Sequence, residues 1–417
     1  MSFDYSAVTS DLLKRLYLDK PYALQKLYID EYPIQAIIPK KSDCGGSYFE
    51  IPVVEASVQS ASQDFSVSQA QAVATSSKTK KFLVTYNTRY ALARISNMLA
   101  AATENDPAAF AQAVTFEVEK AGDTYKFGVE AQLLRNGSGQ IAKMTALATY
   151  YATLESPAEA LFFAPSQVCV FAADESSAIR STYRTVESIA PTTGIIKFTT
   201  SLAADSIGTT DGIFNKGDYA SGGDRLCIMG FAGWNPSSVA SSGDSHFGID
   251  RYVDPFKLAG ITYDATTNTE NILDAINNGL ATANSNGSKP DLVIIHPLQV
   301  GKLLTYLGGR VNYSVLQAKL DDGKLAADVG FEVISFYTPS GKINVMAHPM
   351  QQYNRAQGIK IDKFKLLSMG GSPRVLPNMA TGGLLTVYNY DTAEARIGAY
   401  LNLGCTNTLH NMNVTLV

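Results

Sequence analysis

Two strand-like runs separated by a long stretch without an apolar face constrain the fold of this chain most. Residues 47–54 (SYFEIPVV) and 81–87 (KFLVTYN) alternate in polarity and are rich in aromatic and β-branched side chains, as paired strands are. The Ser-, Ala- and Gln-rich residues 55–80 between them are too many for a hairpin turn. Because a two-stranded ribbon is marginal alone, we predict that residues 46–88 form an arm that reaches away from the body and needs a neighbour.

A long helix is predicted after the arm, over residues 106–135. Asp106 suits the N-cap, Pro107 suits the first helical position, and apolar residues then recur at three- and four-residue spacing up to an Asn-Gly stop. At 1.5 Å per residue such a helix spans roughly 40 Å. Gly122 lies near its middle, where glycine costs about 1 kcal/mol relative to alanine. Close packing and a bend point are the two explanations for that glycine.

The segments on either side of the long helix differ in pattern. Residues 5–18 form a short amphipathic pattern, and the apolar stretch after them suits either an arm laid along another surface or an ordinary docked helix. Residues 160–230 contain short strands separated by turns, which indicates a small all-β unit. From about residue 268 the pattern is mixed α/β, beginning with a helix capped by Thr269, and the C-terminal segment is again strand-like.

Bulk composition points to a soluble chain of more than one lobe with partners on its surface. At 417 residues it exceeds one ordinary core, and only 17% of the residues are charged, where roughly a quarter is usual. The formal net charge of -4 argues against a dedicated nucleic-acid binder. The four cysteines are far apart in the sequence, which predicts reduced, buried thiols. No apolar run is long enough to cross a membrane, and we see no targeting signal.

No combination of residues in the sequence predicts catalysis. His296 and His348 each end an apolar strand before a proline, but no nucleophile elbow, zinc-binding helix motif or phosphate-binding loop accompanies them. We interpret both as structural residues and expect no catalytic, metal or cofactor site. Trp234 is expected to be a packing anchor. Arg251 lies between Asp250 and Asp254, and these three are candidates for an ion pair that ties two segments together.

The order of these parts resembles the HK97-fold major capsid proteins of tailed double-stranded DNA bacteriophages. CGGSYFEIPV resembles the start of the family's E-loop, and KKFLVTYNTRYALARIS resembles its return. GFAGWNPSS followed by DRYVDPFKLAG resembles elements that recur before the A-domain, and KPDLVIIHPLQVGKLLTYLG with GFEVISFYTPSGKINVMAHPM resembles the A-domain itself. The resemblance extends from about residue 20 to 400, and its specificity lies in the order of the parts.

The fold class that this resemblance implies is α+β, an HK97-like capsid fold. Its parts would be an N-terminal arm (1–45), the E-loop (46–90), a P-domain (91–159) with the spine helix (106–135), an inserted small β subdomain (160–230), a connecting segment (231–264), an A-domain (265–375) and C-terminal strands that return to the P-domain (376–417).

The implied function is structural. Copies of the chain would self-assemble into hexamers and pentamers of an icosahedral phage head around double-stranded DNA, in the virion, after assembly in the host bacterial cytoplasm. Portal, scaffolding and decoration proteins are expected partners, contact with DNA would be weak and non-specific, and neither a membrane nor enzymatic activity is expected. The E-loop lies on a neighbouring subunit in this family, which makes the following residues candidates for intersubunit contact: Phe49, Ile51, Val53, Lys78, Lys80, Lys81 and Phe82.

The family also gives sharper meanings to particular residues. Shells of this kind expand as they mature, so Gly122 becomes a candidate bend point of the spine helix. The type member joins an E-loop lysine to an asparagine of a neighbour, and Lys78, Lys80 and Lys81 lie in the corresponding arm. Solvated charge on a strand edge is the plainer interpretation of these lysines. Many relatives begin with a cleaved scaffolding region, whereas here the arm follows the first Met at once, which favours a separate scaffold or no cleavage.

Two alternative functions remain open from the sequence. The same fold builds encapsulin compartments, which hold cargo enzymes instead of a genome. A multidomain hydrolase that uses His296 or His348 is the second alternative, from a different functional class.

Overall fold

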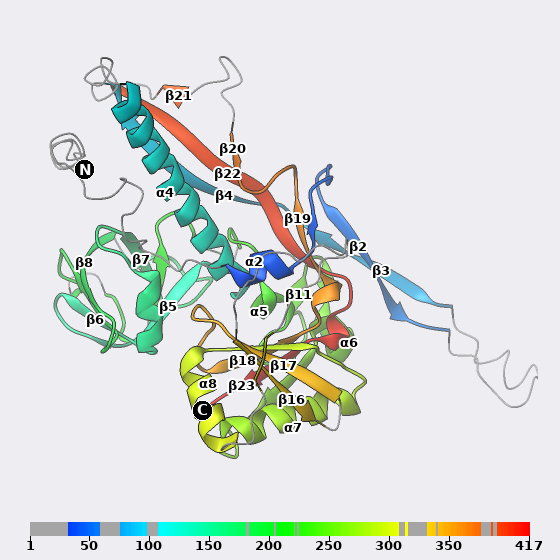
Figure 1. The fold of residues 1–417 in the computed structure, drawn as a ribbon. Helices are drawn as coiled ribbons and strands as arrows, with labels where there is room; N and C mark the ends of the chain where they lie inside the picture. The colour runs from blue at the N-terminus through cyan, green and yellow to red at the C-terminus, as the bar shows by residue number, and fades with distance from the viewer. Residues whose placement is uncertain are drawn as a thin grey trace, which may run out of the picture.

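The computed structural model describes the chain over residues 32–58, 76–97, 107–180, 183–203, 206–220, 222, 225–307, 313–315, 332–338, 341–376, 385–386 and 390–417. Three sequence expectations lie outside these residues, namely the helix over 5–18, the N-cap Asp106 and the middle of the arm over 59–75. The described elements form a long helix on a sheet, a closed barrel, an α/β lobe and a two-stranded arm (Figure 1).

The long helix α4 (Pro107–Leu133) lies along strands β4 (Asn87–Ser96) and β22 (Thr392–Cys405), as Figure 1 shows. The two strands pair antiparallel, and the residues facing the helix are small or aliphatic and mostly buried, so the helix approaches the sheet closely. Shorter strands complete this six-stranded sheet: β1 (Lys40–Lys41), β19 (Phe364–Ser368), β20 (Arg374–Val375) and β21 (Leu385–Thr386).

Six antiparallel strands close into a barrel directly after helix α4. Their order around the barrel is β10 (Gly212–Asn215), β5 (Gln140–Leu147), β6 (Tyr151–Leu154), β9 (Ile195–Phe198), β8 (Arg184–Ala190) and β7 (Val168–Ala172). The interior is a separate hydrophobic cluster that includes Met144, Phe171 and Phe198. The short 3-10 helix η3 (Pro157–Phe162) lies against three of these strands.

The barrel corrects the predicted boundaries of the β unit. It begins at Gln140 and not at residue 160, so strands β5 and β6 belong to it and not to the predicted P-domain. The run DRLCIMG was predicted as a strand, but its described residues 225–230 are irregular. Their backbone groups bond to side chains and turns instead of to a neighbouring strand. Ile228 N–H donates to Gln132 Oε1 (3.4 Å), and Met229 N–H donates to Asn402 Oδ1 (2.9 Å).

The α/β lobe contains a seven-stranded mixed sheet. The strand order is β13 (Ile261–Asp264), β23 (Met412–Thr415), β18 (Arg355–Ile359), β14 (Leu292–Ile295), β17 (Gly341–Ala347), β16 (Glu332–Thr338) and β15 (Tyr313–Val315). Helices α7 (Ile272–Ser285) and α8 (Pro297–Leu307) belong to this lobe, and α7 packs on β13 and β23. The strands and helices predicted around His296 and His348 are present.

Three details of this lobe differ from the prediction. The last strand, β23, pairs with β13 and β18 inside the seven-stranded sheet, so not all C-terminal strands return to the sheet under helix α4. Strand β19, predicted within the A-domain, pairs with β22 instead. The cap of helix α7 is Asn271, whose Oδ1 accepts from Asp274 N–H (3.0 Å), because Thr269 occupies a turn with φ of 51°.

Two glycines of helix α4 have different surroundings. An added Cβ at Gly122 would lie 3.9 Å from Ile397 Cδ1, which is ordinary contact. At Gly128 the Cβ would lie 2.1 Å from Arg89 Nη2, and this guanidinium pairs with Asp218 (3.1 Å). Close packing therefore applies to Gly128, a position that the sequence analysis did not single out, and the bend-point hypothesis for Gly122 stays a prediction.

We predict opposite effects of alanine at these two positions. Gly122→Ala should raise the free energy of unfolding by up to about 1 kcal/mol, because the helix gains propensity without a clash. Gly128→Ala should lower it, because Arg89 must leave Asp218. Chemical denaturation of the two variants measures both changes, and destabilisation by Gly122→Ala would contradict this account.

Candidate intersubunit surface

The arm is a two-stranded antiparallel sheet of β2 (Phe49–Ala56) and β3 (Lys78–Val84). Phe49 pairs with Val84 at its root, and Ala56 pairs with Lys78 at its outer end. In Figure 1 the arm projects from the body on the side opposite the barrel. Its strand bounds agree with the two alternating runs in the sequence to within a few residues.

An aromatic cluster fixes the root of the arm to the chain's own body. Phe82 lies edge-on to Trp234 at 5.3 Å and to His246 at 6.1 Å between ring centroids. Trp234 is fully buried, and its indole N–H donates to Leu403 O (2.9 Å). The backbone also contributes, because Leu83 N–H donates to Phe247 O (3.0 Å). Burial of such rings stabilises by about 1.5–3 kcal/mol each, so the arm starts from a rigid base.

This anchoring changes the role of three predicted contact residues. Phe49, Ile51 and Phe82 are only 8%, 9% and 1% exposed, and all three belong to the chain's main core. Val53 is half-buried against the same core. The inward face of the alternating pattern therefore packs on the body of the same chain, and in this conformation these residues anchor the arm instead of facing another subunit.

The outer half of the arm leaves apolar side chains in solvent. Val54 and Val58 are each 55% exposed, although valine is usually buried. Two of the three predicted lysines are neutralised across the strands, since Lys80 pairs with Glu55 and Lys81 with Glu50, both at 2.5 Å. Such exposed pairs contribute at most about 1 kcal/mol.

Lys78 is exposed at the outer end of β3. Lys80 and Lys81 keep 43% and 58% of their side chains exposed. Joining a lysine to an asparagine requires a dry environment that favours the neutral amine. In the single chain these lysines lie in water, as solvated charges on a strand edge do.

The loop that carries His246 and Phe247 is held by Arg251. Its guanidinium donates from Nε and Nη2 to the two carboxylate oxygens of Asp244 (3.0 and 2.9 Å) and from Nη1 to Gly233 O (2.9 Å). Among the described residues the ion-pair partner of Arg251 is Asp244, and not the flanking Asp250 or Asp254 that the sequence suggested.

The two flanking aspartates act as helix caps. Asp250 accepts from Tyr252 N–H (3.0 Å) at the 3-10 helix η5 (Arg251–Val253), and Asp254 accepts from Lys257 N–H (3.2 Å) at helix α6 (Pro255–Ala259). Asp254 also pairs with Lys257 Nζ at 2.7 Å. Aspartate before a helix commonly accepts a hydrogen bond from a backbone N–H two or three residues ahead. Both aspartates are used in this way, so being next to Arg251 in the sequence does not make them its partners.

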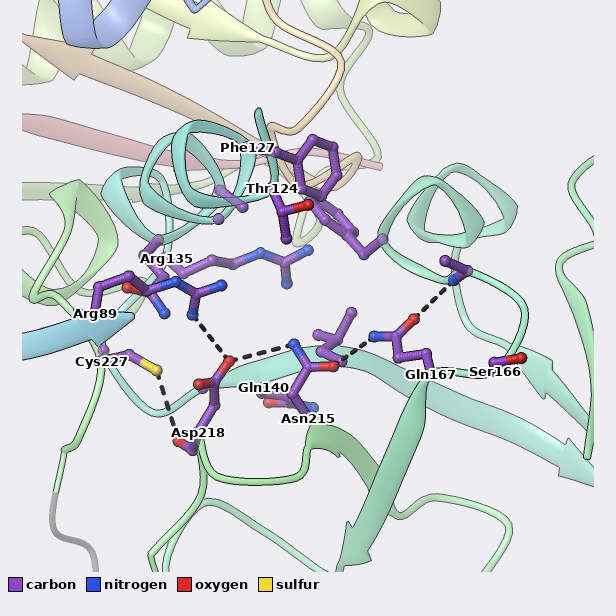
Figure 2. A pocket seen from close by; sticks show the side chains of 18 of the residues that line it. Arg89, Thr124, Phe127, Arg135, Gln140, Ser166, Gln167, Asn215, Asp218 and Cys227 are labelled. Carbon is purple, nitrogen blue, oxygen red and sulfur yellow. Dashed lines mark hydrogen bonds and ion pairs between the residues drawn. The ribbon is translucent and has the colours of Figure 1, made fainter. Parts of the chain in front are cut away.

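A cavity of about 410 Å³ lies between helix α4, strand β4 and the barrel. Figure 2 shows a chain of polar contacts along one wall, where Asp218 accepts from Arg89 Nη1 (3.1 Å) and from Asn215 Nδ2 (3.2 Å). The second guanidinium of the cavity, that of Arg135, pairs with Glu159 (3.2 Å). The charges of both arginines are thus compensated within the chain. One contact joins β4 to the segment after β10, and the other joins the turn at the end of helix α4 to η3.

The two strand-end histidines have matching local structures. His296 Nδ1 accepts from Leu298 N–H (3.2 Å), and His348 Nδ1 accepts from Met350 N–H (3.1 Å). Burial lowers the pKa of His296. His348 Nε2 lies 3.1 Å from Glu130 Oε1. Each imidazole therefore caps the turn that follows its strand.

In the part of the chain that the structure describes, no group of three or more His, Cys, Asp or Glu side chains is arranged to hold a metal ion. No described helix is both long enough and apolar enough to cross a bilayer.

Comparison with known proteins gives likeness in structure but not in sequence. No family model and no curated protein matches the sequence. Among solved structures, the chain is similar to the capsid asymmetric unit of cyanophage A-1(L), with a TM-score of 0.56 and 11% identity over 99% of both chains.

Two weaker likenesses also span whole chains. One is to the capsid of a native GTA particle (TM-score 0.47, 9% identity, 100% of both chains). The other is to the holo-SrpI encapsulin complex of Synechococcus elongatus PCC 7942 (TM-score 0.43, 8% identity, 100% of this chain and 96% of the other). Only the first likeness is strong enough to establish a shared fold.

The aromatic cluster at the arm root predicts a dependence of stability on pH. His246 is buried, its Nε2 has no hydrogen-bond partner among the described residues, and burial together with the nearby Arg251 and Arg225 holds its pKa well below the usual value. The unfolded chain, with a histidine pKa near 6.5, then binds a proton that the folded chain excludes. Stability is therefore full above about pH 6.5 and decreases as the pH falls below it.

We expect His246→Leu to make this decrease shallower, by at most about 1.4 kcal/mol per pH unit. Denaturation midpoints between pH 7.5 and 5 measure the slope separately from any loss of packing, which shifts all midpoints. Burial also lowers the pKa values of His296 and His410, so part of the slope should remain. An unchanged slope in the variant would show that His246 does not contribute.

Proposed function

We propose that this chain, which has the HK97-like capsid fold, is a major capsid protein whose copies assemble into hexamers and pentamers of a closed icosahedral shell around double-stranded DNA. The fold rests on the likeness to the cyanophage capsid subunit over 99% of both chains. The observation that carries the function is the arm, with its buried aromatic root and its exposed apolar outer half.

An arm of this kind becomes more stable when another protein surface covers its outer half. Two paired strands are marginal in water, and exposed apolar side chains beside unpaired strand edges favour contact with another surface. A chain with only 17% charged residues has further surface to bury. A second copy of the same chain is the partner that a shell supplies to every arm.

The position of the arm supports ring-like assembly. It projects from one side of the body, and the barrel lies on the other (Figure 1). A contact in which the arm of one copy meets a different surface of the next is head-to-tail, and repeated rotation closes such contacts into rings. Each contact raises the effective concentration for the next, so many modest interfaces hold a shell together.

The parts of the fold take their roles from this proposal. The arm is the E-loop, helix α4 is the spine helix of the P-domain, the seven-stranded lobe is the A-domain, and the barrel is the inserted subdomain. Portal, scaffolding and decoration proteins are the further partners, and the subunit acts as a structural protein in the virion, assembled in the bacterial cytoplasm. With a net charge of -4, contact with packaged DNA is weak and independent of sequence.

Negative-stain electron microscopy of the purified full-length chain tests the proposal. We expect closed particles of uniform size, and particles purified from infected cells should contain double-stranded DNA. Particles filled with cargo protein would establish the encapsulin alternative. A monomer on sizing chromatography that hydrolyses a substrate and loses this activity in His296→Ala would overturn the shell proposal.

We predict that a charge on the outer arm blocks assembly without harming the subunit. Val58→Asp should reduce the yield of closed particles at least tenfold, because a carboxylate must then be buried against the neighbour. Val239→Asp is the matched control, since Val239 is 59% exposed but lies outside the arm. Both subunits should unfold within about 0.5 kcal/mol of the unaltered chain. Normal particles from Val58→Asp would remove the arm from the interface.

A further inference from the structure

One buried carboxylate joins three separate parts of the chain. Glu130 of helix α4 accepts from the backbone N–H of Ile34 at Oε1 (2.8 Å) and of Gln35 at Oε2 (3.1 Å). The same Oε1 lies 3.1 Å from Nε2 of His348, which follows strand β17. The side chains of Glu130 and His348 are both 0% exposed. Residues 32–38 (hereafter the N-terminal segment), the long helix and the seven-stranded lobe therefore meet at Glu130.

The direction of the histidine bond follows from its other nitrogen. His348 Nδ1 accepts from Met350 N–H, so this nitrogen has a free lone pair and carries no proton. The ring proton is then on Nε2, and His348 donates to Glu130. Three N–H donors thus converge on the two oxygens of Glu130.

The N-terminal segment depends on helix α4 at this point. The short helix α2 (Pro33–Ile37) has no side-chain cap of its own, and Glu130 caps it from another element. Further contacts hold the segment nearby, since Gln35 Nε2 donates to Lys126 O (2.8 Å) and the apolar Ile34 is buried. Departure of this segment would take two of the three donors away from a carboxylate that water does not reach.

A buried carboxylate without its donors is strongly unfavourable. The donors from α2 therefore make the contact between Glu130 and His348 more favourable, and the donor from His348 does the same for α2. Energetic coupling of this kind is reciprocal by thermodynamic necessity.

We infer that Glu130 and His348 form a coupling device, through which docking of residues 32–38 on helix α4 and packing of the seven-stranded lobe on the same helix stabilise each other. A partner that displaces the N-terminal segment would loosen the junction between lobe and helix, and movement of the lobe would release the segment. The device belongs to the single chain and does not depend on the proposed function.

Amide hydrogen exchange on the full-length protein tests the coupling, with His348→Ala as the main variant. Among the described residues this side chain has no hydrogen bond to Ile34 or Gln35 and shares Glu130 with both, so we expect an effect on their amides to pass through Glu130. We expect their exchange to accelerate at least fivefold, the lower end of typical coupling between sites.

His296→Ala is the matched control, because His296 also follows a strand, precedes a proline and accepts from the amide two residues on, but is not bonded to Glu130. This variant should leave exchange at Ile34 and Gln35 unchanged. Equal acceleration in both variants would indicate general loss of stability and overturn the inference. No acceleration in His348→Ala would overturn it as well.

The reverse direction gives an independent test if His348→Ala does not fold. Gln35→Pro removes one donor to Glu130 and also the bond from Gln35 Nε2 to Lys126 O, so it weakens the docking of residues 32–38 on helix α4. We expect exchange at the Met350 amide, which bonds to His348 Nδ1, to accelerate at least fivefold. Unchanged exchange at Met350 would show that the N-terminal segment and the lobe are independent.

Discussion

The packing of helix α4 on strands β4 and β22 is the contact on which the other parts of the molecule depend. Strand β4 continues from the arm root, and the barrel begins just after the helix ends. The seven-stranded lobe reaches the same helix through His348, and Gln357 Nε2 donates to the carbonyl of Leu134, the residue just after the helix (3.3 Å). Buried alanines of β4 and β22 let the helix pack closely on the two strands. A change in the position of the helix on these strands would therefore move every other part of the molecule.

The arm illustrates how a local pattern divides into two roles. Alternation in β2 and β3 gives each strand one apolar face. At the arm root this face is covered by the cluster of Trp234, His246 and Phe247 of the same chain. In the outer half, Val54 lies on the face of β2 opposite Phe49 and Ile51, and Val54 and Val58 are exposed. For the proposed contact with a neighbour, a rigid root keeps the outer half ordered beforehand, which would reduce the entropy lost on association.

Periodicity in the sequence was sufficient for elements formed by local rules. The long helix, the two arm strands and the strands and helices around His296 and His348 were predicted because their patterns are set within each segment. The pairing of β23 with β13 and the start of the barrel at Gln140 were not, because strand partners distant in sequence are chosen by packing.

The same limit applies to the candidate site residues. The sequence places Phe49, Ile51 and Phe82 on an apolar face, but it does not reveal whether the same chain or another subunit covers that face. For Arg251, the partner Asp244 lies across a small hairpin, and the flanking aspartates are used by the backbone. A pattern gives the chemistry of a residue, and its partner depends on the fold.

Buried polar contacts at the junctions explain how these parts keep one arrangement. Apolar packing alone tolerates sliding, whereas a buried polar group is satisfied in one geometry only. Asn402 of β22 accepts from Met229 N–H (2.9 Å) and donates to Thr85 O (2.8 Å), and Asp218 and Glu130 play similar roles at the barrel and the lobe. In the proposed assembly of many copies, an error in the angle between parts would recur at every interface. Polar contacts at each junction set the geometry of the single chain, which is what such an assembly requires.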